Sequence, residues 1–166
     1  MKQLTQHFNL AEFFKTSTGL KNETTDQNIL ANIENLAETL ENIRVAFGAP
    51  VYISSGFRSA AVNKKVGGAS GSQHTKGEAA DLQVCKGGIP ELKRLLKVIV
   101  TCGVAWDQLI VEHSGTSHWI HISSKRKSSG PNRNMILLYV DGKYTSITKK
   151  YVLDICCKTK WKGEKY

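Results

Sequence analysis

The longest hydrophobic pattern in the chain covers Asp26–Phe47 and has the period of an α-helix. Its apolar side chains recur at steps of three and four residues, which places them on one helical face. They are Leu30, Ile33, Leu36, Ala37, Leu40 and Ile43. Gly48 and Pro50 follow the pattern, and both residue types end helices. We therefore expect a core helix over this range.

Shorter patterns predict two strands, a loop and a second helix in the middle of the chain. Alternating residues over Val51–Ser55 predict a strand, as does the apolar segment Ala79–Cys85. The segment Gly67–Gly77 between them is rich in glycine and serine and predicts a loop. Ile89–Cys102 has helical periodicity and precedes Gly103, so it predicts an amphipathic helix.

Two hairpins and a short helix are expected in the rest of the chain. Asp107–Glu112 and His118–Ser123 are apolar-rich runs joined by a short polar segment, which predicts an antiparallel hairpin. Met135–Val140 and Lys143–Ile147 flank an Asp-Gly dipeptide, the strongest tight-turn signal in the chain. Tyr151–Cys157 predicts a short helix before a basic tail. These elements predict an α+β fold, with a small antiparallel sheet packed against helices.

The composition is that of an ordinary folded protein, with 40% apolar and 22% charged residues among 166. This length suits a single domain covering residues 1–166. No stretch approaches the roughly 20 apolar residues of a membrane span. The first residues lack the apolar run of a secretory signal, so we expect synthesis in the cytoplasm. The four cysteines lack CxxC spacing, which favours reduced thiols over a cysteine metal site.

The formal net charge of +9 favours encounters with polyanions, such as nucleic acid, anionic lipid or an acidic cell-wall polymer. The net charge alone does not indicate which of these polyanions the protein binds. Part of it lies in Lys125–Lys127 and in the tail segment Lys158–Lys165, for which a solvated surface is the simpler interpretation. The chain has no nucleic-acid recognition motif and no aromatic stacking series, so we expect no specific nucleic-acid partner.

The first two candidate metal ligands are a histidine and an aspartate seven residues apart. His74 lies at the end of the glycine-rich loop, and Asp81 lies within an apolar strand between Ala80 and Leu82. A buried carboxylate must be paired, hydrogen-bonded or bound to a metal ion. Gly77 lets the chain turn sharply, so that loop and strand can aim both side chains at one point. Metal binding would explain the buried charge.

His121 is the candidate third ligand, because it is a polar residue at a strand position between Ile120 and Ile122. Two imidazoles and a carboxylate with one open position are typical of catalytic zinc sites. Structural zinc sites are instead closed by four ligands, usually including cysteine. The three residues therefore indicate one catalytic Zn²⁺ ion.

Hydrolysis at such a site also needs a general base, and Glu112 and His118 compete for this role. If His113 pairs with His118 across the hairpin, Glu112 lies opposite Trp119 and shares a face with His121. That register favours Glu112 and points His118 to the other face, and a slip of one residue would reverse the choice. His118 stays a second catalytic candidate, as a group that stabilises the oxyanion if it reaches the cleft.

Three further residues are candidates for substrate binding. Arg58 directly follows a strand, in a turn that would present it to a cleft. Its planar guanidinium suits a peptide's free C-terminus or an acidic side chain, and its alternative role is to brace the loop through backbone carbonyls. Ser72 and Gln73 precede the first histidine ligand and are expected to shape the loop or the pocket.

Several segments together resemble one known family. They are SGFRS, Asn63, the pair Gly67-Gly68, SQHTKGEAADL, DQLIVE and WIHIS. On these segments the chain is similar, over residues 4–123, to the zinc D-alanyl-D-alanine carboxypeptidases. This family includes vancomycin-resistance dipeptidases and phage L-alanyl-D-glutamate endolysins, and it shares its fold with the Hedgehog signalling domain. Residues 124–166 carry little of the resemblance.

The resemblance implies the same metal ligands as the residues themselves. The family pattern SxHxxGxAxD is filled at every fixed position, by Ser72, His74, Gly77, Ala79 and Asp81. Together with the WIHIS histidine, it implies zinc binding by His74, Asp81 and His121. Many members place an acidic base three residues before the last histidine ligand, where this chain has His118. In the branch with a DQLIxE strand, the glutamate of that strand, here Glu112, is the available carboxylate.

We therefore expect a zinc-dependent peptidase that hydrolyses peptide bonds in peptidoglycan stem peptides. It would act as a D,D-carboxypeptidase or as an endopeptidase of the endolysin type. The alternative is a catalytically silent, zinc-stabilised module that binds the cell wall. We expect a monomer that another factor releases to the cell wall, in a phage or prophage context. A recycling enzyme that stays in the cytoplasm is the alternative.

Overall fold

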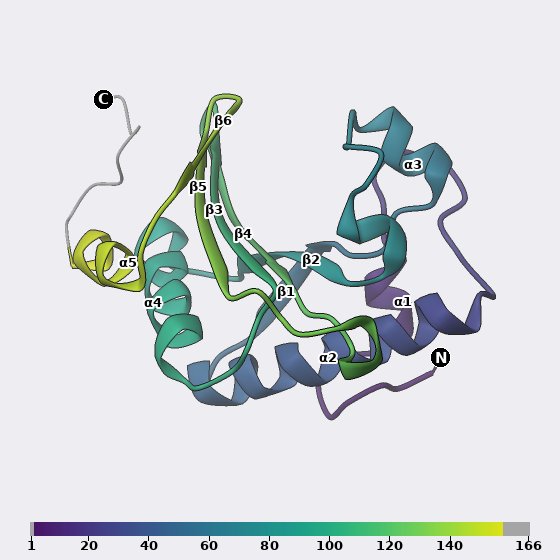
Figure 1. Cartoon of the computed structure of the whole chain (residues 1–166), viewed down its shortest axis with the longest axis horizontal. Helices are drawn as coiled ribbons and strands as arrows, with labels where there is room; N and C mark the ends of the chain where they lie inside the picture. Colours follow the sequence, from purple (N-terminus) through teal and green to yellow (C-terminus); the bar gives the residue numbers. More distant parts are fainter. Residues whose placement is uncertain (1, 158–166) are drawn as a thin grey trace.

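The computed structural model describes residues 2–157. Its helices are α1 (Leu10–Phe13), α2 (Gln27–Phe47), α3 (Ala60–Lys65), α4 (Gly88–Thr101) and α5 (Lys149–Cys156), with 3-10 turns η1 (Gln73–Lys76) and η2 (Lys127–Ser129). Its strands are β1 (Val51–Ser55), β2 (Ala79–Val84), β3 (Gln108–Ser114), β4 (Ser117–Ser123), β5 (Met135–Val140) and β6 (Lys143–Ser146). Figure 1 shows their arrangement. The basic tail Lys158–Lys165 lies outside the described residues.

The strands form one open sheet in the order β1-β2-β4-β3-β5-β6. Neighbouring strands are antiparallel except β3 and β5, which are parallel. Because β4 returns the chain to the end where β3 began, β5 can start there and run beside β3 without a helical crossover. The predicted α+β class is confirmed, and the sheet differs from the expected antiparallel one in this single pair.

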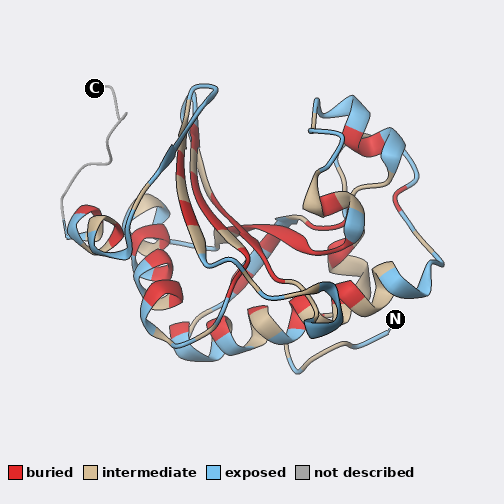
Figure 2. Ribbon diagram, in the orientation of Figure 1, coloured by how far each residue is buried: buried red, intermediate tan, exposed pale blue. Residues whose placement is uncertain are grey.

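One face of the sheet packs against helices. Side chains alternate between the faces along each strand, and those of Leu82, Leu109 and Ile120 are fully buried. They belong to one apolar cluster with the inner sides of α2 and α4 (Figure 2). Asp81 and His121 occupy the alternate positions and belong to the other face. The sheet therefore separates the core from the face that carries the polar candidates.

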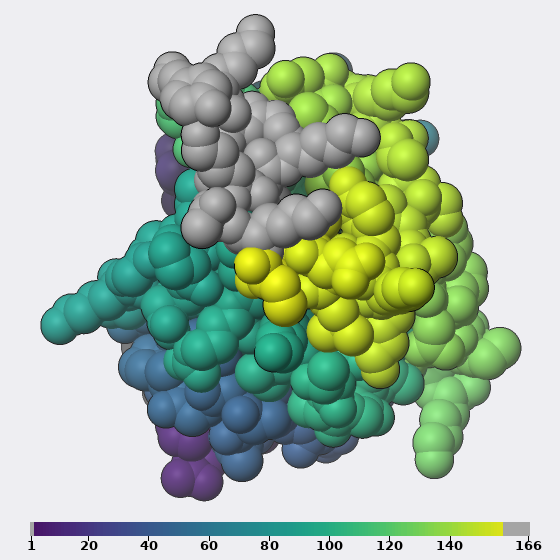
Figure 3. Space-filling model, turned by 90° about the vertical axis from the view of Figure 1, so that its left-hand side faces the viewer, coloured from purple at the N-terminus to yellow at the C-terminus, as the bar shows by residue number. Residues whose placement is uncertain are grey.

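α5 extends the helical layer at its C-terminal side. Thr148 caps it by accepting a hydrogen bond from the backbone N–H of Tyr151 (3.1 Å). Val152 turns inward and is fully buried in the same cluster as the core of α4. Figure 3 views this side of the molecule, where α5 (yellow) lies between α4 (teal) and the β5–β6 hairpin (yellow-green). α5 thus supports the sheet behind the hairpin.

The long helix predicted from Asp26 onward is confirmed. Asp26 is its N-cap and accepts hydrogen bonds from the backbone N–H groups of Asn28 (2.8 Å) and Ile29 (3.3 Å). Gly48 ends it in the left-handed conformation, with φ of +70°. Both predicted hairpins are also present. The predicted loop Gly67–Gly77 contains η1, and α1 and α3 were not predicted, because elements of four to six residues are too short to show a helical period.

All four cysteines lie among the described residues, and each is a free thiol. Cys85 and Cys157 are exposed, whereas Cys102 and Cys156 are half-buried. No helix within residues 2–157 is long and apolar enough to cross a membrane.

Candidate metal centre and active site

His74 lies on η1, and close backbone packing fixes its position. A Cβ at Gly77 would lie 2.8 Å from Cγ1 of Ile33, and the φ of +71° there already disfavours any side chain. The carbonyl of Gly56 accepts a hydrogen bond from Nδ1 of the His74 ring (2.7 Å). In the neutral ring, Nε2 therefore carries the lone pair. The fold thus presents His74 Nε2 as a metal ligand.

Asp81 and His121 come from neighbouring strands. They are direct partners in the antiparallel pair of β2 and β4, so their side chains leave the same face of the sheet. Both are buried. Their strand neighbours Ala80, Leu82 and Ile120 face the core instead. Asp81 and His121 are therefore polar because they face a candidate metal site on the side of the sheet away from the helices.

The three candidate ligand atoms converge. His121 Nδ1 lies 3.0 Å from Asp81 Oδ1 and 3.2 Å from His74 Nε2, and His74 Nε2 lies 3.3 Å from the same oxygen. A tetrahedral zinc site with bonds of about 2.0–2.1 Å has ligand atoms about 3.3 Å apart. Among the described residues, this is the one group of at least three histidine, cysteine or acidic side chains close enough to hold a metal ion. Its geometry and donor types fit zinc.

Arg58 holds the ligand carboxylate. Its Nη2 donates to Asp81 Oδ2 (2.7 Å) and its Nε donates to Ser55 Oγ (2.9 Å). Burial alone would raise the pKa of Asp81, but the adjacent imidazoles of His74 and His121 hold it well below its ordinary value. Oδ1 is thus left as an ionised oxygen facing the two histidines. Arg58 also lines the cavity described next, so it combines a positioning role with access to a ligand.

The candidate metal ligands lie in a cavity of about 680 Å³, and Glu112 lines it as well. The β3–β4 register pairs His113 with His118 and Glu112 with Trp119, and this is the register that favours Glu112 as the base. Burial raises the pKa of Glu112 to about 7, and the charge of Asp81 adds to the shift. The cavity therefore holds a carboxyl group that exchanges protons near neutral pH, beside the candidate metal centre.

His118 lies elsewhere. Its ring packs on that of His113, with ring centroids 4.4 Å apart, and His113 is buried. Alternation along β4 places His118 on the face opposite His121, and it does not line the cavity. The condition for an oxyanion role, access to the cleft, is not met in this structure. His118 is therefore no part of the mechanism proposed below.

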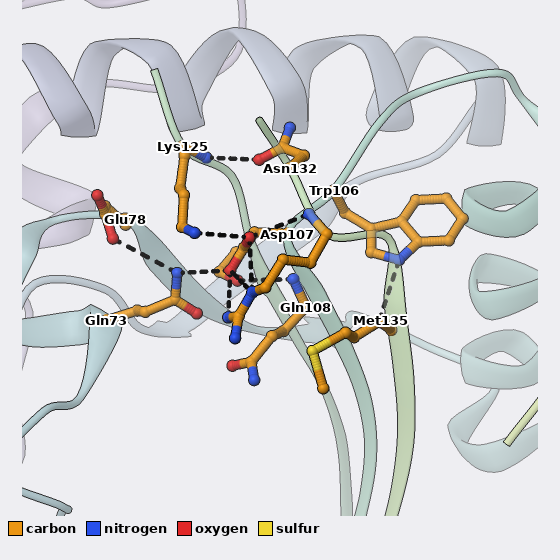
Figure 4. Close-up of polar contacts among 10 residues, drawn as sticks. Gln73, Glu78, Trp106, Asp107, Gln108, Lys125, Asn132 and Met135 are labelled. Atoms are coloured by element: carbon orange, nitrogen blue, oxygen red, sulfur yellow. Dashed lines mark hydrogen bonds and ion pairs between the residues drawn. The ribbon is translucent and has the colours of Figure 1, made fainter. Parts of the chain in front are cut away.

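Ser72 and Gln73 both line the cavity, and an ionic network around a buried carboxylate holds Gln73 in place (Figure 4). Asp107 is fully buried and accepts hydrogen bonds from Gln73 Nε2 (3.0 Å) and Arg133 Nε (2.9 Å), with Lys125 Nζ at 3.0 Å. Burial would raise the pKa of Asp107, but hydrogen bonds from Arg133 and Lys125 hold it well below its ordinary value. The network ties η1 to the strands behind it.

Asp107→Asn is expected to lower the free energy of unfolding by about 2–3 kcal/mol. The substitution removes the negative charge between Arg133 and Lys125 and leaves two cations close together. The loss stays below that of a fully buried pair because both cations are partly exposed. Urea unfolding measures it. Glu91→Gln, which breaks an exposed ion pair with Arg94, is the control and should cost less than about 1 kcal/mol; equal losses would contradict the assignment.

Sequence reasoning missed the cavity residues that follow β4. Arg133, Leu137 and Tyr144 line the cavity, although none was a candidate. The Asp-Gly turn predicted the hairpin that carries Leu137 and Tyr144, but no local signal says which strand that hairpin joins. Its placement depends on the parallel pairing of β5 with β3, a contact between segments far apart in the sequence.

The chain was also compared with known proteins. The family model described as Peptidase M15 matches residues 6–123. The matched segment includes the three candidate ligands and Glu112, and it ends with β4. No curated protein matches the chain at a significant level.

Proposed function

Because the chain belongs to the Peptidase M15 family, we propose that it is a zinc peptidase that hydrolyses peptide bonds in peptidoglycan stem peptides. The observation that carries the proposal is the convergence of His74, Asp81 and His121 beside Glu112 in one cavity. The family supports the peptidase chemistry. Stem peptides as substrates are supported by the motif resemblance to peptidases that act on D-amino acids.

When bound, zinc supplies Lewis-acid chemistry, because it polarises a carbonyl group and makes water acidic near neutral pH. The protein's own part begins with Glu112, whose carboxylate accepts a proton from the attacking water. With a pKa of about 7, raised by burial, the resulting carboxylic acid can release that proton again to the leaving amine. Glu112 would thus act first as general base and then as general acid.

Arg58 would bind the substrate's negative charge. Its Nε and Nη2 are engaged with Ser55 and Asp81, and within the described residues Nη1 has no hydrogen-bond partner. The free edge of the guanidinium can donate to a substrate carboxylate or to the oxygen that gains charge during attack. The contact with Asp81 keeps this edge close to the metal centre.

Removal and return of the metal ion test the proposal. Purified protein should cleave isolated muropeptides, lose this activity when EDTA removes the metal, and regain it when Zn²⁺ is added back in slight excess. Mass spectrometry of the products would identify the scissile bond and separate a carboxypeptidase from an endopeptidase. Zinc binding and retention on cell walls without any cleavage product would instead indicate the silent binding module.

A further inference from the structure

The β5–β6 hairpin forms one wall of the cavity and lies outside the family-matched residues 6–123. The parallel register of β3 and β5 places Tyr139 beside Glu112, and the hairpin register places Tyr144 opposite Tyr139. On its other side, Glu112 is paired with Trp119 of β4. The four side chains therefore form one row across four strands, with the candidate base between aromatic residues.

Tyr144 stands at the open end of this row. Its ring packs on Tyr139 with the ring centroids 4.7 Å apart, which holds it against the sheet. It lines the cavity, yet 56% of its surface is exposed. Burial raises the pKa of its hydroxyl, and the carboxylates of Glu112 and Asp81 add to the shift, so the group stays a hydrogen-bond donor at neutral pH.

The opposite wall carries a second exposed apolar side chain. This wall is formed by the segment Val66–Gly71, which follows α3. The exposed side chain is that of Val66, with 49% of its surface exposed. Figure 1 shows α3 and the β5–β6 hairpin on opposite sides of the molecule, with the strands of the metal site between them. A chain lying across the metal centre would remove both apolar groups from water, which favours binding.

We propose that Tyr144 is a specificity-determining residue that contacts the substrate on the hairpin side of the metal centre, away from the scissile bond. The inference rests on the proposed peptidase function. A substrate that reaches Tyr144 as well as the opposite wall is longer than a dipeptide. The enzyme should therefore favour a stem pentapeptide over a dipeptide with the same scissile bond.

The test compares Tyr144→Ala and Tyr144→Phe with wild type on a synthetic stem pentapeptide and on the dipeptides D-Ala-D-Ala and L-Ala-D-Glu. Tyr144→Ala should lower kcat/KM for the pentapeptide by about three- to tenfold, the usual contribution of one aromatic contact, and leave dipeptide cleavage unchanged. Tyr144→Phe removes only the hydroxyl, so it separates the contribution of the hydroxyl to kcat/KM from that of the ring. Tyr52→Ala is the matched control, because Tyr52 is an exposed tyrosine of the same sheet, on β1, outside the cavity.

Equal kcat/KM for Tyr144→Ala and Tyr52→Ala on the pentapeptide would overturn the inference. So would an equal loss on pentapeptide and dipeptide, since this would indicate a disturbed metal centre. If wild type cleaves nothing, the proposed function fails, and calorimetry with the zinc-loaded protein and the pentapeptide still tests Tyr144. Weaker binding by Tyr144→Ala would then support the contact, and unchanged binding would refute it.

Discussion

Replacing Glu112 with glutamine is expected to slow peptide cleavage by about 10²- to 10⁴-fold, the usual contribution of a general base. Glutamine keeps the shape of the side chain but cannot accept a proton from the attacking water. Zinc content should stay at one ion per chain, because Glu112 lies beside the ligand set and is not part of it. Steady-state kinetics and metal analysis on the same preparation measure both quantities.

His118→Ala is the matched control, since it removes the competing candidate on the opposite face of β4. This variant should keep both its zinc and most of its activity. Full activity of Glu112→Gln combined with a large loss in His118→Ala would reverse the assignment of the base.

Wild type and Glu112→Gln should also differ in how kcat/KM depends on pH. In wild type, kcat/KM should fall as the pH drops through the pKa of Glu112, because only the carboxylate accepts the proton. Burial raises this pKa to about 7, and a bound cation favours the charged form, so the midpoint should lie at or below about 7. The residual activity of Glu112→Gln should lack this acid limb. An unchanged limb in the variant would assign it to another group.

Two of the three candidate metal ligands stand out in the sequence because they contradict their surroundings, whereas His74 lies in a polar loop and was selected by its spacing to Asp81. Asp81 and His121 are polar residues in apolar strands, and only the face away from the core can accept them. The β3–β4 register that favours Glu112 could also be predicted from the sequence, because a hairpin with a short turn leaves few ways to pair its strands. The sequence therefore predicts the part of the site that depends on local pairing.

The second wall of the cavity could not be predicted in the same way. In a strand over Met135–Val140, every second side chain shares a face, but the sequence does not indicate which strand lies next to it. That neighbour is β3, joined in parallel. The position of Tyr144 follows only from this long-range contact, as does the pairing of Asp107 with Arg133. Both are set by how the last part of the chain packs against the sheet.

His121→Ala is expected to abolish stoichiometric zinc binding and with it cleavage. The substitution leaves the contact between Arg58 and Asp81 intact but removes one of the three proposed ligands. The two remaining ligands would hold zinc only weakly. Adding zinc to about a hundred times its dissociation constant should raise the Tm of metal-free wild type by roughly 5–10 °C, since binding to the folded state contributes about 2.7 kcal/mol.

The His121 variant should show no such rise at the same zinc concentration. His118→Ala, three residues earlier on the same strand, should show the full rise, because its ring packs on His113 away from the metal centre. The comparison separates loss of a ligand from general damage to β4. If both variants kept the zinc-dependent shift in Tm, His121 would not be a ligand, and the close approach of Asp81 and the two imidazoles would need to be explained by a shared proton instead.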